Sequence, residues 1–311
     1  MSFTKPETIN SPSGASLGVR IAAPKSAPHA VIHVNHGLAE HSARYGRFAE
    51  KLVDFGYAVI AHDHRGHGLT KAPDAPHGVF GLAGNGVDLV MMDCAAVQAH
   101  ALAVFGDVPV FMFGHSMGGL IAMNYALRHP DKMAGAAVWN ANFSGGVAGR
   151  LGLGLLAYEK FRLGSDVPSR IMPKLTFADW ARKIPNRRSE FDWLSNIDEE
   201  VDAYIADPEC GWDASVSMWQ DVFKMIFAGG DLSNPSSALQ RLPFMLVGGG
   251  KDPSTFSGNA VKHQADRLRK AGVLSVTHHH FANARHETLN DLDAEAATKL
   301  FQDWISAQLD N

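Results

Sequence analysis

Short apolar runs alternate with longer helix-like stretches along the chain from residue 30 onward. Such alternation is typical of β-α-β units, in which parallel strands form a sheet that helices cover on both faces. We predict strands at 30–34, 57–61, 108–113, 135–139, 244–247 and 275–281, and helices at 47–55, 87–105, 117–128, 259–270 and 294–309. The expected fold class is therefore α/β, with a mostly parallel central sheet.

The segment 142–242 interrupts this alternation. It begins with Gly-rich apolar sequence, continues as polar helical stretches, and holds four of the six tryptophans: Trp180, Trp193, Trp212 and Trp219. An insertion of this length between two strands predicts a helical cap above the strand ends, where open α/β sheets bind ligands. We expect an α/β core of residues 1–141 and 243–311 with a cap at 142–242. The residues leave open whether each tryptophan lines a site or only packs within the cap.

Composition and charge exclude several classes of protein. Lys and Arg number 28 against 32 Asp and Glu, so the net charge of -4 provides no basic surface for nucleic acid. The two cysteines, Cys94 and Cys210, are too few for a disulfide framework and form no C-x-x-C motif. Residues 1–14 lack a secretory apolar segment, and we expect no apolar run of the roughly 18 residues that span a bilayer. We therefore expect a cytoplasmic protein.

The predicted strand at 108–113 leads directly into the sequence Gly-His-Ser-Met-Gly at 114–118, which a predicted helix follows. A G-x-S-x-G motif between a strand and a helix is typical of a nucleophile elbow, a turn so tight that glycines must flank the serine. Backbone N–H groups at the start of the following helix can stabilise a developing negative charge. Ser116 is therefore the candidate nucleophile.

A serine nucleophile needs a histidine as base and a carboxylate that orients the histidine. In this fold the acid follows a later strand and the histidine follows the last one. Asp252 lies in a turn after the strand at 244–247, and His286 follows the strand at 275–281. The acid can also follow the strand at 135–139, but that position holds the uncharged Asn140. Asp231 is the next candidate for the acid after Asp252. The three histidines at 278–280 lie within a strand, where side chains alternate, so we predict no metal there.

Four motifs resemble those of the monoacylglycerol lipase and lysophospholipase branch of the α/β-hydrolases, whose hydrolase domain is of the serine aminopeptidase S33 type. They are HGLAEHSARY at 36–45, DHRGHG at 63–68, GHSMGG at 114–119 and ARHE at 284–287, and a DPECG segment at 207–211 resembles bacterial members. The resemblance implies an α/β-hydrolase fold with Ser116, Asp252 and His286 as the triad. It also implies that the backbone N–H groups of Leu38 and Met117 form the oxyanion hole.

Two positions depart from the pattern of this branch. Ala39 replaces the second glycine of the first motif, which could narrow the pocket behind the oxyanion hole, and Thr70 replaces a serine. Charged residues of the motifs, such as Glu40 and Arg44, are expected to hold the loops around the site together, since partly buried charges need partners.

The resemblance implies a serine hydrolase that cleaves carboxylic esters of a single acyl chain, of the monoacylglycerol or lysophospholipid type, through an acyl-enzyme on Ser116. We expect no cofactor and no metal. The apolar stretch 149–163 of the cap suits a wall for an acyl chain and a transient contact with a membrane surface. A short-chain carboxylesterase with a small acyl pocket, a peptidase, and a hydrolase-fold binding protein without turnover remain alternatives. The oligomeric state stays open.

Overall fold

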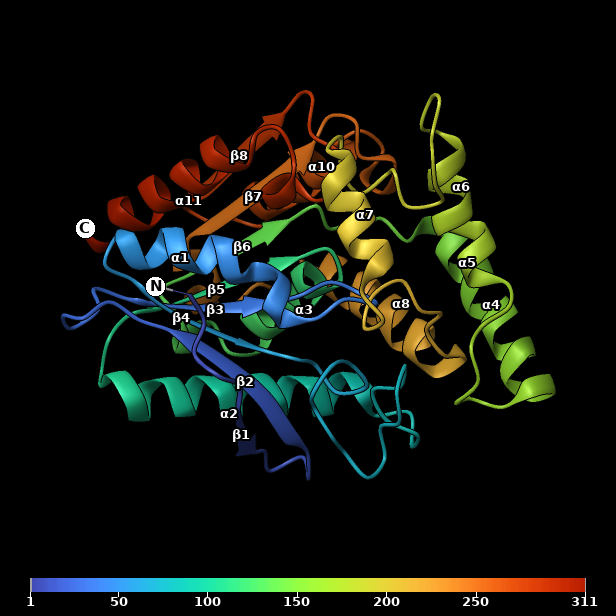
Figure 1. Cartoon of the computed structure of the whole chain (residues 1–311), viewed down its shortest axis with the longest axis horizontal. Coiled ribbons are helices and arrows are strands. Elements are labelled where there is room, and N and C mark those ends of the chain that lie inside the picture. The colour runs from blue at the N-terminus through green and yellow to red at the C-terminus, as the bar shows by residue number, and fades with distance from the viewer. Residues whose placement is uncertain (1, 311) are drawn as a thin grey trace.

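The computed structural model describes residues 2–310 and confirms the α/β fold with a mostly parallel sheet. In these residues, eight strands form one sheet in the order β1-β2-β4-β3-β5-β6-β7-β8 (Figure 1). The strands are β1 (Glu7–Asn10), β2 (Ser16–Ala22), β3 (Val31–Asn35), β4 (Ala58–His62), β5 (Val110–His115), β6 (Gly135–Trp139), β7 (Phe244–Gly249) and β8 (Val276–Phe281).

Neighbouring strands from β4 to β8 are parallel, so their carboxyl ends meet at one edge of the sheet. Strands β3 to β7 are buried along their whole length, which explains their continuous apolar sequences. The antiparallel strands β1 and β2 were not predicted. Strand β1 is mostly exposed and polar, and β2 carries Arg20 among its apolar residues, so neither shows the apolar run of a buried strand.

Helices cover both faces of the sheet (Figure 1). On one face α1 (Gly46–Asp54) and α11 (Ala294–Leu309) pack against aromatic side chains of the strands, including Phe113 and Trp139. On the other lie α2 (Gly86–Phe105), α3 (Met117–Arg128) and α10 (Asn259–Lys270). Short 3-10 helices lie at Ser42–Tyr45, Pro130–Lys132, Pro253–Thr255 and Thr288–Asn290.

Helix α2 is long and apolar enough, by length and composition alone, to cross a membrane, with a mean hydropathy of 1.4. We did not expect such a run. Half of this apolar window is buried inside the molecule, where Val90, Cys94 and Val97 pack into the core beside the sheet. This burial is the ordinary property of a core helix, and it accounts for the hydropathy of α2.

Helices α4 to α9 occupy the segment between β6 and β7, for which we keep the name cap (residues 142–242). They are α4 (Gly146–Leu163), α5 (Met172–Leu175), α6 (Phe177–Arg182), α7 (Asp198–Ala206), α8 (Val216–Gly230) and α9 (Ser237–Arg241). Figure 1 shows α4, α5 and α6 stacked beside α7 and α8 at one end of the molecule. Helix α4 packs closely on α8, since a Cβ at Gly152 would lie 3.0 Å from the Phe223 ring.

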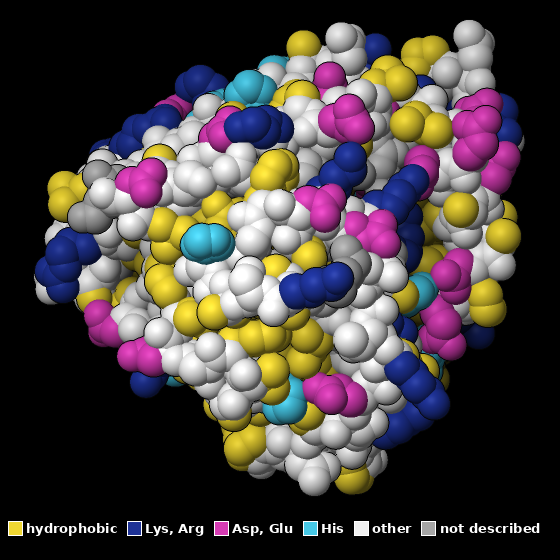
Figure 2. Space-filling model, turned by 60° about the vertical axis from the view of Figure 1, so that its left-hand side comes forward, with side chains coloured by type: hydrophobic (Ala, Val, Ile, Leu, Met, Phe, Trp, Pro, Cys, Tyr) yellow, Lys and Arg dark blue, Asp and Glu magenta, His cyan; other side chains and the backbone are white. Residues whose placement is uncertain are grey.

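Charged side chains are dispersed over the surface. Figure 2 shows basic and acidic side chains interspersed on the face that it displays, with no extended patch of one sign. This distribution agrees with the small net charge of -4 and provides no electrostatic footprint for a polyanion on that face.

Candidate active site

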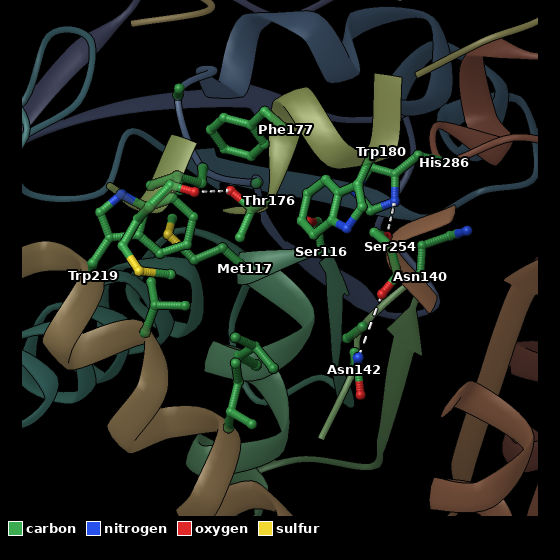
Figure 3. Close-up of a pocket in the computed structure, with 18 of the residues that line it drawn as sticks. Ser116, Met117, Asn140, Asn142, Thr176, Phe177, Trp180, Trp219, Ser254 and His286 are labelled. Atoms are coloured by element: carbon green, nitrogen blue, oxygen red, sulfur yellow. Dashed lines mark hydrogen bonds between the residues drawn. The ribbon is translucent and has the colours of Figure 1, made fainter. Parts of the chain in front are cut away.

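Ser116 lies between β5 and α3 in a strained backbone conformation, with φ of 55° and ψ of -117°. Its N–H donates to the Trp139 carbonyl of the neighbouring strand at 2.9 Å. The flanking glycines are required, because a Cβ at Gly118 would lie 2.0 Å from the backbone oxygen of Asn35. Such strain persists only where surrounding contacts enforce it, and here it presents Ser116 at the head of α3 (Figure 3).

Asp252 and His286 form a buried hydrogen-bonded pair. The Nδ1 atom of His286 lies 3.0 Å from Oδ2 of Asp252. Asp252 follows β7 and caps the short helix Pro253–Thr255, whereas His286 follows β8. Burial alone would raise the pKa of Asp252, but the interaction with His286 and hydrogen bonds from Ser254 and Asn140 lower it to about 2. The carboxyl group is therefore ionised and can orient the imidazole.

Ser116 and His286 line one cavity, at the edge where the parallel strands end (Figure 3). No hydrogen bond joins these two side chains in the described part of the chain. Hydrogen bonds of this kind are often long in ligand-free enzymes and shorten when substrate binds. The other acid candidate, Asp231, is exposed and caps the end of α8. Its carboxylate accepts a hydrogen bond from the Ser233 N–H.

The loop after β3 brings a second backbone N–H group to the cavity. Leu38 lines the cavity together with Met117, and Met117 is the first residue of α3, whose N–H has no acceptor within the helix. No hydrogen bond from the Leu38 N–H exists among residues 2–310. Two free donors beside Ser116 suit the stabilisation of an oxyanion.

Ala39 adopts a left-handed backbone conformation, with φ of 54°. A glycine at this position would adopt it without strain, so the departure from the motif imposes a backbone cost on this chain. The cap holds the strained residue, because the Ala39 carbonyl accepts hydrogen bonds from the Gly211 N–H at 3.0 Å and from the Tyr204 hydroxyl at 2.9 Å.

Charged motif residues connect the oxyanion loop to the histidine turn. Arg44 pairs with Glu40 at 2.6 Å and binds both carboxylate oxygens of Glu287. His115 lies next to Glu40 and places Nε2 2.9 Å from the His286 carbonyl oxygen. Burial opposes the charges of this network, but the interactions with Glu40 raise the pKa of His115, and Arg44 lowers the pKa of Glu287. The network fixes the backbone on both sides of the cavity.

Sequence reasoning missed several residues that contact the acid or the base. Asn140, which we set aside as an acid, donates to Oδ2 of Asp252 at 3.2 Å. Ser254 bonds to both Asp252 and His286, and the Trp193 ring packs on the His286 ring at 4.8 Å between centroids. The position of Asn140 at the end of a strand beside the acid was the one available signal.

The cavity has a volume of about 560 Å³, in the range of small-molecule sites. Most of its wall is apolar and comes from the cap, including Leu151, Leu155, Met172, Leu175, Phe177, Trp180, Trp193, Trp219, Val222, Phe223 and Ile226. Three of the four cap tryptophans thus line the cavity. Trp212 instead packs at a tilt against the rings of His67 and His77.

Three potential metal ligands approach one another at the border between the oxyanion loop and the cap. They are His41, Asp207 and Cys210, which each offer one ligand atom, and these three atoms lie within 4.8 Å of one another. Their separation in the sequence showed no zinc motif, so we did not expect this group. His41 and Asp207 are already paired at 2.9 Å, and burial raises the pKa of the Cys210 thiol well above its usual range. The contacts account for the group as a hydrogen-bonded pair of His41 and Asp207 beside a protonated thiol.

Comparisons with known proteins agree with the α/β fold and identify the family. A family model described as serine aminopeptidase, S33, matches residues 26–293. The mouse monoglyceride lipase is 28% identical over 302 residues, which cover 93% of this chain and 89% of that protein. The monoacylglycerol lipase of Mycolicibacterium smegmatis is 26% identical over 298 residues, or 94% and 95% of the two chains.

Solved structures share the fold over nearly the whole chain. A thermostable carboxyl esterase from Bacillus coagulans superposes with a TM-score of 0.86 and 23% identity, covering 99% of both chains. A monoacylglycerol lipase from Paleococcus ferrophilus superposes with a TM-score of 0.70 and 23% identity, covering 94% of this chain and 99% of that one.

Proposed function

Since the chain belongs to the serine aminopeptidase S33 family of α/β-hydrolases and is a carboxylic ester hydrolase, we propose that it cleaves esters of a single acyl chain, of the monoacylglycerol or lysophospholipid type. The observation that carries this proposal is the composition of the cavity at Ser116. Its wall is formed mainly by apolar side chains of the cap, which suit an acyl chain better than a polar group.

In the proposed mechanism Ser116 Oγ attacks the ester carbonyl carbon while His286 Nε2 accepts the hydroxyl proton. The oxyanion accepts hydrogen bonds from the N–H groups of Leu38 and Met117. His286 then gives its proton to the departing alcohol, which leaves an acyl-enzyme on Ser116. Water attacks this ester with His286 again as base, and the carboxylic acid and Ser116 are released. Asp252 stays ionised throughout and orients the imidazole.

The charges at the cavity favour an ester substrate over a peptide with a free α-ammonium group. An aminopeptidase must bind the α-ammonium group of its substrate, and a buried cation needs a carboxylate that is free to pair with it. Glu40 and Glu287 are the carboxylates that line the cavity in the described part of the chain, and Arg44 already pairs with both. We therefore rank peptide hydrolysis below ester hydrolysis.

The outer side of α4 supports a transient contact with a membrane surface. Phe161 is 89% exposed, Val147 74% and Leu151 65%, and Leu151 also lines the cavity. Exposed apolar side chains beside a lipid-binding cavity suit the entry of a substrate that resides in a membrane. This contact and the cytoplasmic location are part of the proposal.

Hydrolysis of a ladder of soluble acyl esters tests the substrate class. Each buried methylene contributes about 0.8 kcal/mol, so kcat/KM should rise about fourfold per added carbon until the cavity is full. Leu155→Asp should remove this rise and leave two-carbon esters unaffected, because Leu155 lines the cavity. The matched control Phe161→Asp changes an exposed residue of the same helix and should leave the profile unchanged.

A maximum at two to four acyl carbons would instead identify a short-chain carboxylesterase. Turnover of amino acid anilides without turnover of esters would identify a peptidase. An absence of turnover with every ester and every anilide would identify a hydrolase-fold binding protein without catalysis.

A further inference from the structure

The hydroxyl group of Ser254 lies between the acid and the base. Its Oγ atom is 2.6 Å from Oδ1 of Asp252 and 3.0 Å from Nδ1 of His286, and Figure 3 shows it against the imidazole. An ionised carboxylate only accepts hydrogen bonds, so the Ser254 proton is donated to Asp252. The lone pairs of Oγ are then directed to the imidazole, where they accept from the Nδ1–H.

The Nδ1–H of His286 therefore has two acceptors at equal distance. Oδ2 of Asp252 and Oγ of Ser254 each lie 3.0 Å from Nδ1. Both acceptors favour the tautomer with its proton on Nδ1, which leaves Nε2 free to accept the proton of Ser116. Ser254 supports this tautomer by a route that does not depend on Oδ2.

The backbone fixes Ser254 in this position. It lies in the short helix Pro253–Thr255, and its own N–H donates to Oδ1 of Asp252 at 2.9 Å. Its carbonyl oxygen accepts from the Asn142 side chain at 3.4 Å, and only 8% of the residue is exposed. A hydroxyl held in this way loses little further freedom when it accepts from the imidazole.

We infer that Ser254 is a second orienting group for His286, a positioning residue that acts together with Asp252 on the imidazole. The inference deepens the proposed function and rests on it. Thr255 provides the matched comparison, because its hydroxyl donates to the same carboxylate at 2.9 Å but forms no hydrogen bond with His286 in the described part of the chain.

The experiment compares Ser254→Ala with Thr255→Val, each in the native chain and in the Asp252→Ala variant. In the native chain Ser254→Ala should lower kcat about 3- to 10-fold, the effect of one hydrogen bond, with KM unchanged. In the Asp252→Ala variant no carboxylate is left to take the Ser254 proton, so the hydroxyl is no longer held as an acceptor and Ser254→Ala should have no further effect. Thr255→Val should have no further effect in the Asp252→Ala variant.

Equal effects of the two substitutions in the native chain would overturn the inference. If the double variant does not fold, the downfield Nδ1–H proton resonance of His286 decides: it should shift in Ser254→Ala and stay in place in Thr255→Val, and the reverse would contradict a positioning role. Labelling of the native enzyme by a fluorophosphonate distinguishes a failure of the proposed function from a failure of the role of Ser254. Failure to label Ser116 contradicts the proposed function, whereas normal labelling with equal variant effects contradicts the role of Ser254 alone.

Discussion

At Gly118 the first turn of α3 approaches the end of β3 so closely that no side chain fits. An alanine Cβ there would lie 2.0 Å from the Asn35 oxygen, which belongs to the backbone and cannot rotate away. We predict that Gly118→Ala destabilises the fold by roughly 3 kcal/mol or more and displaces Ser116, because α3 must move from the sheet. Urea unfolding and ester hydrolysis measure both effects.

Gly154 provides the control for this substitution. It lies within α4, and nothing lies within 4 Å of its added Cβ. Gly154→Ala should be neutral or stabilise the protein by about 0.5–1 kcal/mol, because alanine loses less conformational entropy in a helix. Equal unfolding midpoints for the two variants would mean that the elbow is not closely packed.

The side chains of the candidate site differ in how far the sequence predicts them. Ser116, Asp252 and His286 follow from the order of strands and turns, because each lies in the segment that follows a strand. The acid and base are indeed in contact, and all three residues lie at the same edge of the sheet. The role of Ser254 could not be predicted. Its contact with His286, which lies 32 positions further along the chain, depends on the direction of its side chain within a tight turn.

At the scale of elements, the buried strands and the helices that cover them were predictable, with ends shifted by one or two residues. Apolar periodicity indicates these elements because both faces of a parallel sheet are buried. The hairpin of β1 and β2 lacks that pattern, since it forms the edge of the sheet. In the cap, sequence indicated helices but not their contacts: Gly149 and Gly152 fit α4 against α8, which leaves Phe161 in solvent.

For the whole molecule, five buried histidines make stability depend on pH. This histidine cluster consists of His33, His36, His62, His64 and His67, each at most 1% exposed. Burial lowers the pKa of all five, that of His33 to about 3. Glu40 and Asp63 oppose this effect at His36, but burial dominates. The folded protein therefore keeps the cluster neutral in mildly acidic solution, where the unfolded chain binds protons.

The sign of the pH effect follows from these lowered pKa values. The contribution of the neutral histidine cluster to the free energy of unfolding is complete above the unfolded pKa of about 6.5. It is lost as pH falls, by up to about 1.4 kcal/mol per pH unit for each histidine. His115, whose pKa is raised, has the opposite sign, but it is one group against five. We predict that the free energy of unfolding changes little from pH 8 to 7 and falls by several kcal/mol by pH 5, as measured by urea unfolding.

Two substitutions test the origin of this dependence. His64→Asn removes a histidine whose ring nitrogens are both buried without a partner, so it should reduce the slope by about 1.4 kcal/mol per pH unit. His263→Asn changes an exposed histidine of α10 and should leave the slope unchanged. If the free energy of unfolding of the native chain is constant between pH 8 and 5, the histidine cluster does not make stability depend on pH.

In the proposed mechanism Ser116 is the nucleophile and forms the acyl-enzyme. This role can be tested by reaction with a fluorophosphonate, followed by mass spectrometry of the intact protein and its peptides. We predict one adduct per chain, on the peptide that contains Ser116, and no adduct in the Ser116→Ala variant, which should fold normally and lose on the order of 10⁶ in kcat. An adduct on another residue, or unchanged ester hydrolysis by Ser116→Ala, would show that Ser116 is not the nucleophile.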